Sequence, residues 1–276
     1  MIVRLWGTRG SVASPGPETV RYGGNTACLE VRTDDALLVL DAGTGIRRLG
    51  ATLREHRGRI DLLLTHLHLD HLQGIAFFEP CFRPDIELHI WGPPSTTLSL
   101  RERLSRYLSP PLFPVFLRDL GSHVSLHDVP SEPFSIGSVT VDGEAIIHPG
   151  PTVGYRISSG GRTLAYLPDH EPALGAPSFP ISPDWTSGHR LAAGADLLIH
   201  DAQYTEEEYA SRVGWGHSSL EQTWAFALQA GVRRLVTFHH DPSHGDDQLD
   251  QMVADLQSRD GPEVIGGREG LEFSLA

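Results

Sequence analysis

The chain has 276 residues, enough for one large α/β domain or two smaller ones, and its 39% hydrophobic share is that of an ordinary globular protein. The formal net charge of -13 argues against a broad basic surface, so tight binding to long nucleic acid is not expected. Bound cations would reverse the charge locally, so nucleotide substrates are not excluded. Cys28 and Cys81 allow at most one disulfide, and no signal peptide or membrane span is recognisable. We therefore expect a cytoplasmic protein.

The predicted strands form two successive sets, each accompanied by helical patterns. The first set covers residues 2–6, 27–32, 37–40, 60–64 and 86–91. The second set covers residues 139–147, 154–157, 163–167, 197–200 and 234–238. Helical periodicity covers residues 45–56, 97–108, 218–230 and 248–257. The pattern predicts a single domain over residues 1–276, with two sheets facing each other, helices outside, and two halves that meet near Gly121.

Two irregular stretches interrupt this pattern. Residues 9–25 are rich in Gly, Pro and Ser, and are either a long ordered loop near a site or a surface loop. Residues 171–188 contain four prolines and form either a lid or a connection. The predicted helix with Arg101, Arg103 and Arg106 could act as a compact basic patch, but we interpret it as a solvated helix face.

The densest group of metal-binding side chains follows the apolar stretch at residues 60–64. His66, His68, Asp70 and His71 lie within six residues, where a buried strand gives way to a loop. The extended spacing of His66 and His68 places both imidazoles on one side of the chain. Asp70 and His71 follow a turn and can face a second ion. Imidazole and carboxylate together predict two divalent ions, with zinc favoured over manganese or iron.

Three further candidate ligands, His148, Asp169 and His239, each follow a strand-like run. Alone, such a histidine is more often structural than a ligand, but the first cluster leaves its ions in need of partners, and strand ends converge in packed sheets. His240 competes with His239, which we favour. Such a set predicts a two-metal centre, whose ions hold a hydroxide that attacks phosphorus or a carbonyl carbon. The expected ligand sets are His66, His68 and His148 for one ion, Asp70, His71 and His239 for the other, and Asp169 as the bridge.

A second constellation lies downstream, where Asp201 ends a buried strand and His217 precedes a predicted helix. Ser218 and Glu221 have the spacing of a capping box for that helix. His217 would then be fixed before a helix N-terminus, in a position suited to donating a proton, with Asp201 orienting its other ring nitrogen. A loop histidine beside a capped helix is the equally weighted alternative. Upstream, Asp41 begins a glycine turn without the lysine of a P-loop, so we expect it to support the metal loop through hydrogen bonds.

These residues resemble the motifs of the metallo-β-lactamase fold superfamily. The five motifs match Asp41, His66-x-His68-x-Asp70-His71, His148, Asp169 and His239. The chain is most similar to the branch that includes ribonuclease Z and the phosphonate-operon cyclic phosphodiesterases. That narrower resemblance rests on Trp6-Gly7-Thr8-Arg9-Gly10, Leu198-Ile199-His200-Asp201-Ala202 and Gly216-His217-Ser218-Ser219. The resemblance spans nearly the whole chain and implies an α/β fold, specifically a four-layer αββα sandwich.

The chain departs from the family pattern in three ways. Ribonuclease Z proteins commonly carry a long basic arm between the positions of His148 and Asp169, which here are only 21 residues apart (169 minus 148). Asp201 replaces the glutamate of a His-Glu-Ala-Thr motif, which shortens its reach toward His217 by one methylene. The common zinc β-lactamases have a cysteine where this chain has Asp169, so antibiotic hydrolysis is not expected.

The sequence therefore predicts a metal-dependent hydrolase, most specifically a phosphodiesterase for a small cyclic or nucleoside phosphodiester, with a hydroxide between two ions as the nucleophile. Beside the ligands, the predicted catalytic residues are Asp70, His217 and Asp201, with His217 assisting the leaving group. The alternatives are a thioester hydrolase of the glyoxalase II kind and a non-catalytic metal-bound sensor. The expected partner is the small substrate, with no long nucleic acid and no membrane, and a homodimer is left open.

Overall fold

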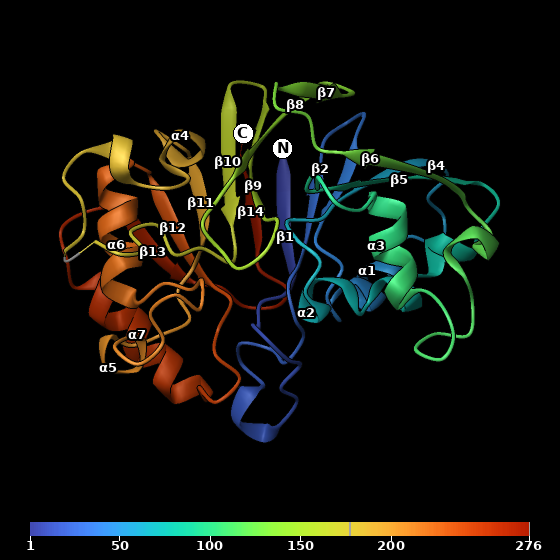
Figure 1. Ribbon diagram of the computed structural model, residues 1–276. Coiled ribbons are helices and arrows are strands. Elements are labelled where there is room, and N and C mark those ends of the chain that lie inside the picture. Colours follow the sequence, from blue (N-terminus) through green and yellow to red (C-terminus); the bar gives the residue numbers. More distant parts are fainter. Residues whose placement is uncertain (177, 276) are drawn as a thin grey trace.

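Two seven-stranded sheets face each other in the computed structural model, which describes residues 1–176 and 178–275 (Figure 1). The strands of the first sheet are β1 (Ile2–Gly7), β2 (Cys28–Arg32), β3 (Leu37–Leu40), β4 (Gly58–Leu63), β5 (Ile86–Gly92), β6 (His123–Asp128) and β14 (Glu272–Ser274). The strands of the second sheet are β7 (Phe134–Ile136), β8 (Val139–Ala145), β9 (Val153–Ser159), β10 (Arg162–Leu167), β11 (Leu197–Asp201), β12 (Arg234–Phe238) and β13 (Glu263–Gly266).

The two sheets share one pairing pattern. The first has the order β14-β1-β2-β3-β4-β5-β6, antiparallel as far as β3 and parallel from β3 to β6. The second has the order β13-β12-β11-β10-β9-β8-β7, parallel from β13 to β10 and antiparallel beyond. Because neighbouring parallel strands end at the same edge, each sheet brings several strand ends together there.

Helices cover the outer face of each sheet, so the fold is the predicted four-layer αββα sandwich. In Figure 1, α1 and α3 lie outside the first sheet, and α4, α6 and α7 lie outside the second. The α-helices are α1 (Ile46–Thr52), α2 (Leu69–Leu72), α3 (Leu100–Tyr107), α4 (His189–Ala192), α5 (Glu206–Tyr209), α6 (Leu220–Gln229) and α7 (Asp246–Gln257). The 3₁₀ helices are η1 (Pro17–Thr19), η2 (Ile75–Phe77), η3 (Glu79–Phe82), η4 (Leu117–Asp119) and η5 (Pro183–Trp185).

The hydrophobic core has three layers that match this architecture. Between the sheets, Leu5 and Leu63 of the first pack in one cluster with Tyr155 and Phe238 of the second. A second cluster joins the first sheet to α1 and α3, and a third joins the second sheet to α4, α6 and α7. The parallel strands β4 and β11 are largely buried on both faces, which explains why they appear in the sequence as mainly apolar runs.

The ten predicted strands are present, but the remaining strands in the described ranges, β6, β7, β13 and β14, were not predicted. The chain passes to the second sheet after Asp128 rather than near Gly121, because β6 is still the edge strand of the first sheet. In β6, Val124 and Leu126 pack toward the helices while the alternate residues are polar, a weaker signal than an apolar run. Cys28 and Cys81 are both free and buried. In the described ranges we found no helix with the length and apolarity needed to span a bilayer.

Candidate metal centre

The predicted site residues meet at one edge of the sandwich, where parallel strands of both sheets end. The loop after β4 carries the cluster from His66 to His71, and the β8–β9 connection carries His148. Asp169 and His239 follow β10 and β12, and β11, which ends at Asp201, lies between those two strands. Residues from five separate chain segments are thus brought together by strand order alone.

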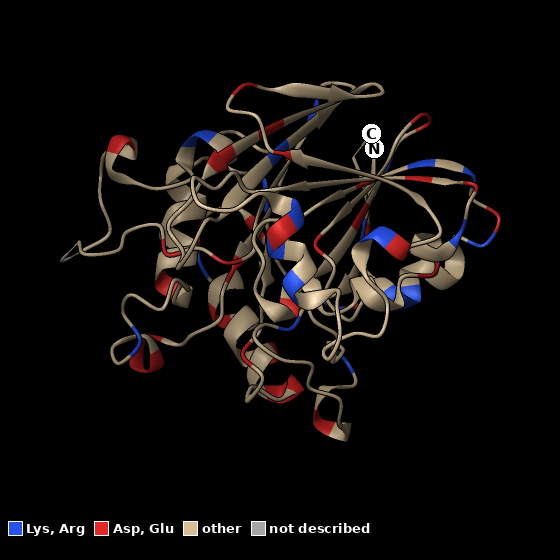
Figure 2. Cartoon of the chain, turned by 45° about the vertical axis from the view of Figure 1, so that its right-hand side comes forward, with Lys and Arg blue, Asp and Glu red and all other residues tan. Residues whose placement is uncertain are grey.

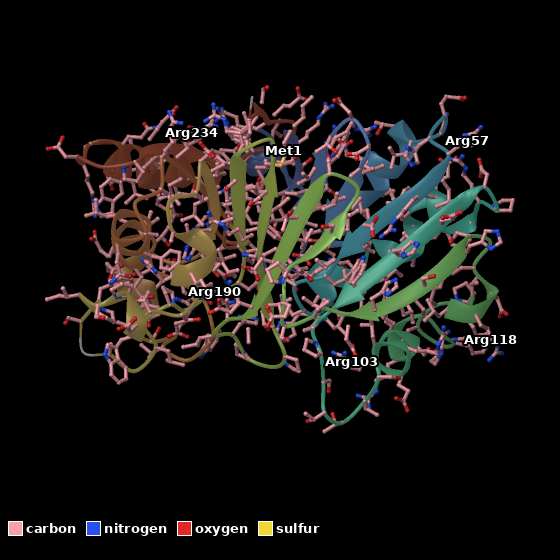
Figure 3. The ribbon with its side chains drawn as sticks, turned by 90° about the horizontal axis from the view of Figure 1, so that it is seen from above. Met1, Arg57, Arg103, Arg118, Arg190 and Arg234 are labelled. Atoms are coloured by element: carbon pink, nitrogen blue, oxygen red, sulfur yellow. The ribbon has the colours of Figure 1, made fainter. Side chains whose placement is uncertain are left out.

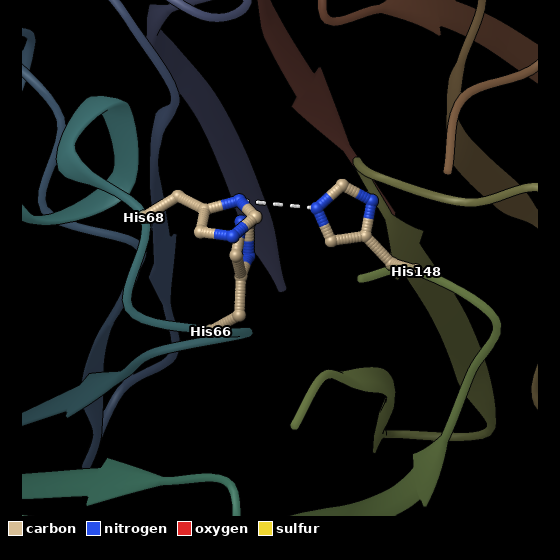
Figure 4. Close-up of side chains that lie close together, drawn as sticks. All are labelled: His66, His68 and His148. Atoms are coloured by element: carbon tan, nitrogen blue, oxygen red, sulfur yellow. Dashed lines mark hydrogen bonds between the residues drawn. The ribbon is translucent and has the colours of Figure 1, made fainter. Parts of the chain in front are cut away.

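The first group of candidate ligands consists of three imidazoles (Figure 4). The ligand atoms of His66, His68 and His148 all lie within 4.8 Å of one another. His148 Nε2 and His68 Nδ1 are 3.1 Å apart, the contact drawn as a dashed line in Figure 4. His148 Nδ1 donates to the carbonyl oxygen of Gly216 at 2.8 Å, and because a carbonyl only accepts, Nε2 is left free to bind a metal. Three nitrogen donors this close together could hold one metal ion.

The second group is fully buried and contains two carboxylates. The ligand atoms of Asp70, His71, Asp169 and His239 also lie within 4.8 Å of one another. His239 Nε2 is 3.1 Å from Asp70 Oδ2 and 3.2 Å from Asp169 Oδ2. Asp169 Oδ2 also lies 3.7 Å from His66 Nε2 and 3.8 Å from His148 Nε2, so this carboxylate borders both groups as expected of a bridge.

The structure places His239, and not His240, in the cluster. His239 has a positive φ of 58°, which turns the backbone between the two residues. His240 points the other way, where its Nε2 lies 2.8 Å from the carbonyl oxygen of Gly267 and its ring packs edge-on against Tyr22. Phase along a strand could not separate the two histidines, because the turn at His239 interrupts the strand alternation.

The donor set fits divalent cations. His66 Nε2 is buried and has no hydrogen-bond partner within residues 1–176 and 178–275. Burial lowers the pKa of His66 well below its ordinary value and that of His148 to about 4, so both rings are neutral and able to ligate. Burial opposes ionisation of Asp169, but the rings of His239 and His71 hold its pKa well below the usual range. Two buried carboxylates among five imidazoles are suited to holding positive charge.

Asp41 supports this centre, which confirms the role expected for it. Its buried carboxylate accepts hydrogen bonds from the Thr65 amide at 2.8 Å, from His71 Nδ1 at 2.8 Å and from the hydroxyl of Tyr166 at 2.9 Å. Thr65 Oγ1 also donates to Asp41 and lies 3.0 Å from His66 Nδ1, which can therefore donate to it. Asp41 thus fixes His71 directly and His66 through one hydroxyl.

Asp201 and His217 form a buried pair next to the second group. Asp201 Oδ2 accepts from His217 Nδ1 at 2.7 Å, so the aspartate reaches the imidazole despite being one methylene shorter than a glutamate. The His217 ring stacks on His239 with ring centroids 4.9 Å apart. Burial alone would lower the pKa of His217, but the Asp201 carboxylate raises it to about 9.

The predicted capping box is wrong. The cap of α6 is Ser219, whose side chain accepts from the amide of Gln222 at 3.2 Å. Ser218 faces inward, where its amide donates to Asp201 Oδ1 and its hydroxyl to the carbonyl of His170. Glu221 pairs instead with Arg259. Because Asp201 takes the amide of Ser218, the helix begins one residue later than the sequence spacing suggested.

Three supporting residues were not predicted from the sequence. Glu171 is fully buried, and its carboxylate accepts from the amides of Gly214 and Gly216 and from the hydroxyl of Tyr209, so it holds the loop that supports His148. The amide of Ser11 donates to Asp70 Oδ2 at 2.8 Å, so residues 9–25 are a loop at the site. Gln203 lies beside His239. A glutamate in a proline-rich stretch and single polar residues in loops carry no distinctive spacing.

The chain is a metallo-β-lactamase fold hydrolase by fold and by site. Residues 37–240 match the family model described as "Beta-lactamase superfamily domain", and the chain belongs to that family. It is 27% identical to a ribonuclease Z of Gemmatimonas aurantiaca, over all of this chain and 96% of the relative.

Among solved structures, the human tRNase Z, short form, covers 100% of both chains with a TM-score of 0.70 and 22% identity. A diphosphatase from the PhnP family covers 100% of this chain and 98% of its own, with a TM-score of 0.71 and 19% identity. The family match, the hydrolase names of these relatives and the cluster of candidate ligands together make this protein a hydrolase whose fold implies divalent metal ions.

Proposed function

We propose that this hydrolase is a phosphodiesterase that acts on a small cyclic or nucleoside phosphodiester at a centre of two divalent metal ions. The observation that carries the proposal is the convergence of two ligand groups on one shared carboxylate, beside a histidine held by a separate aspartate. His66, His68 and His148 would hold one ion, and Asp70, His71 and His239 the other, with Asp169 between them.

The side chains around such a centre would have different roles. When bound, two divalent ions polarise a phosphodiester and make water a nucleophile at neutral pH. Asp70 belongs to the second group and is oriented by the amide of Ser11. His217 presents Nε2 as its free ring nitrogen, because Nδ1 is committed to Asp201. Its place beside His239 suits a general acid that protonates the leaving oxygen.

A small substrate fits the surface of the protein better than a folded RNA. The interval between His148 and Asp169 is filled by β9 and β10 and has no room for an arm. In Figure 2 acidic and basic segments are both scattered over the molecule, and the arginines labelled in Figure 3 lie in separate parts of it. Several of them are paired, for example Arg190 with Asp142. Binding a tRNA body requires several clustered phosphate contacts, whereas a metal centre alone can attract one phosphodiester.

The experiment is a substrate panel on zinc-loaded protein: bis(p-nitrophenyl) phosphate, a cyclic nucleotide, a thioester and a precursor tRNA. We expect turnover of the first two and little of the others. Preference for the thioester would favour an enzyme of the glyoxalase II kind, and no turnover with zinc bound would favour a sensor.

The competing hypothesis is that the substrate is a folded RNA. Such a substrate requires a basic surface, for which the helix α3 is the candidate. Arg101 and Arg106 are exposed there, while Arg103 donates to the carbonyl of Pro93 and supports the fold. Site-specific cleavage of the precursor tRNA that weakens in Arg101→Ala and Arg106→Ala variants would overturn the small-substrate proposal. Cyclic nucleotide turnover that is unchanged in the same variants would support it.

A further inference from the structure

We propose that Gln203 is a positioning residue, whose side-chain amide fixes the ring of His239 in the tautomer that presents Nε2 to the metal centre. The inference rests on the proposed function and deepens it, because it concerns the same site but a residue outside the seven candidate ligands. Gln203 is 2% exposed and follows β11 at a tight turn, where its backbone amide donates to Asp201 Oδ1 at 3.0 Å.

The first step is the orientation of the Gln203 amide. Its nitrogen lies 3.4 Å from Asp241 Oδ2, 3.2 Å from the hydroxyl of Tyr204 and 3.5 Å from Ser11 Oγ. A hydroxyl can accept or donate, but a carboxylate only accepts. Asp241 therefore decides which end of the amide faces it, and the NH₂ group must be that end. The oxygen Oε1 is left facing His239.

The second step is the tautomer of His239. Gln203 Oε1 and His239 Nδ1 are 2.7 Å apart. Because an amide oxygen only accepts, the proton must be on Nδ1, and the lone pair of Nε2 then faces Asp70 and Asp169. Asp241 thus fixes the orientation of the Gln203 amide, and Gln203 in turn fixes the tautomer of His239. The His239 ring can then ligate a metal only through Nε2.

The surroundings leave the His239 ring little freedom to find another arrangement. A Cβ atom at Gly10 would come within 2.4 Å of His239 Nδ1, so the backbone of residue 10 closes that side of the ring. The other face stacks on His217. The acceptor on Nδ1 is therefore a fixed part of the site, comparable with the Asp41 carboxylate on His71, although Gln203 carries no charge.

Removing the acceptor should weaken one metal position and not the other. Gln203→Met keeps the volume of the side chain and removes the oxygen. Losing the partner of a ligating histidine typically costs 10–100-fold in metal affinity. We expect the affinity for the zinc ion bound by His239 to fall by about 10–100-fold. The affinity for the zinc ion bound by His66, His68 and His148 should not change.

The experiment is a zinc titration of metal-free protein, with wild type, Gln203→Met and a control. The control is Gln229→Met, since Gln229 is a half-buried glutamine that donates to the carbonyl of Pro180 away from the site. In the zinc-loaded proteins, the exchange rate of the His239 Nδ1 proton is measured by NMR. It should be slow in wild type and the control, and at least about tenfold faster in Gln203→Met.

A rescue variant separates positioning from general damage. Gln203→Glu combined with Asp241→Asn exchanges the donor and the acceptor, so an acceptor still faces His239 and a donor faces residue 203. We expect it to restore both zinc affinity and slow exchange. Two zinc ions bound at wild-type affinity by Gln203→Met, or a rescue variant no better than Gln203→Met, would overturn the role of Gln203. A wild-type protein that binds no zinc would overturn the proposed function as well.

Discussion

The two candidate ligand groups differ in charge and in burial, although the same loop after β4 contributes to both. The first group has three imidazoles, of which His68 is exposed, and no carboxylate of its own. The second has Asp70 and Asp169 among buried imidazoles. A buried carboxylate is costly unless a cation or hydrogen bonds compensate it. The second group therefore requires a bound cation to compensate its buried carboxylates, more than the first group does.

The supports of the two groups differ in the same way. His148 is held by the carbonyl of Gly216, and that loop is held in turn by Glu171, two steps from the ligand. His71 is held directly by the carboxylate of Asp41. We therefore predict that substitutions in and directly beside the second group lower metal affinity strongly, and mainly at that position. Substitutions behind the first group should lower metal affinity less, because a loop lies between them and the ligand His148.

The largest expected effect is that of Asp169→Ala, since this carboxylate borders both groups. Its loss removes a ligand from each ion and leaves their charges unscreened. Zinc content should fall from about two ions to below about one per chain, and activity to background. Metal analysis after gel filtration measures the zinc content, and circular dichroism checks that the fold is kept. If the variant retained two ions and near-normal activity, Asp169 would not be a bridge.

His217→Ala should slow the reaction without removing metal. As a general acid outside the ligand set, His217 is worth roughly 10²–10⁴-fold in rate. The loss should shrink for substrates with a good leaving group such as p-nitrophenolate, which needs little protonation. Steady-state rates on both kinds of substrate, with metal content determined in parallel, test this. An equal loss across leaving groups would assign His217 to binding the phosphoryl oxygens instead.

Asp41→Asn should weaken the second metal position more than the first, because Asp41 contacts His71 directly and His66 only through Thr65. An asparagine places an NH₂ group against either the amide of Thr65 or His71 Nδ1, both of which are donors. We expect an affinity loss of about 10–100-fold at the second position and a destabilisation of about 1–3 kcal/mol. A zinc titration and a denaturant unfolding curve measure the two effects. An affinity loss confined to the first position would contradict the assignment of Asp41.

The sequence predicted the fold and the converging residues because both rest on strong, local patterns. Mainly apolar runs marked β4, β10, β11 and β12, and polar residues at or directly after their ends marked the strand ends. Parallel strands place such ends at one edge, so the predicted ligands converge without any knowledge of side-chain contacts.

What the sequence did not predict depends on contacts between distant segments. Ser11 acts on Asp70 through a backbone amide, which every residue type possesses. The start of α6 shifted because Asp201, from another strand, takes the amide of Ser218. The edge strand β6 has only half of an apolar pattern, since its other face is polar. These features follow from packing, and single-segment patterns do not contain them.

The smallest expected effect is that of Glu171→Gln, the counterpart of Asp41→Asn in the first group. The amide oxygen of the new side chain can still accept from Gly216, and its NH₂ group can donate to the hydroxyl of Tyr209, which can reverse its role. We expect a destabilisation of about 0.5–1.5 kcal/mol and less than a tenfold loss of zinc affinity, confined to the first position. Glu207→Gln, at an exposed position of α5, is the matched control. A loss larger than that of Asp41→Asn, or one at the second position, would show that the loop transmits strain to the ligands instead of damping it.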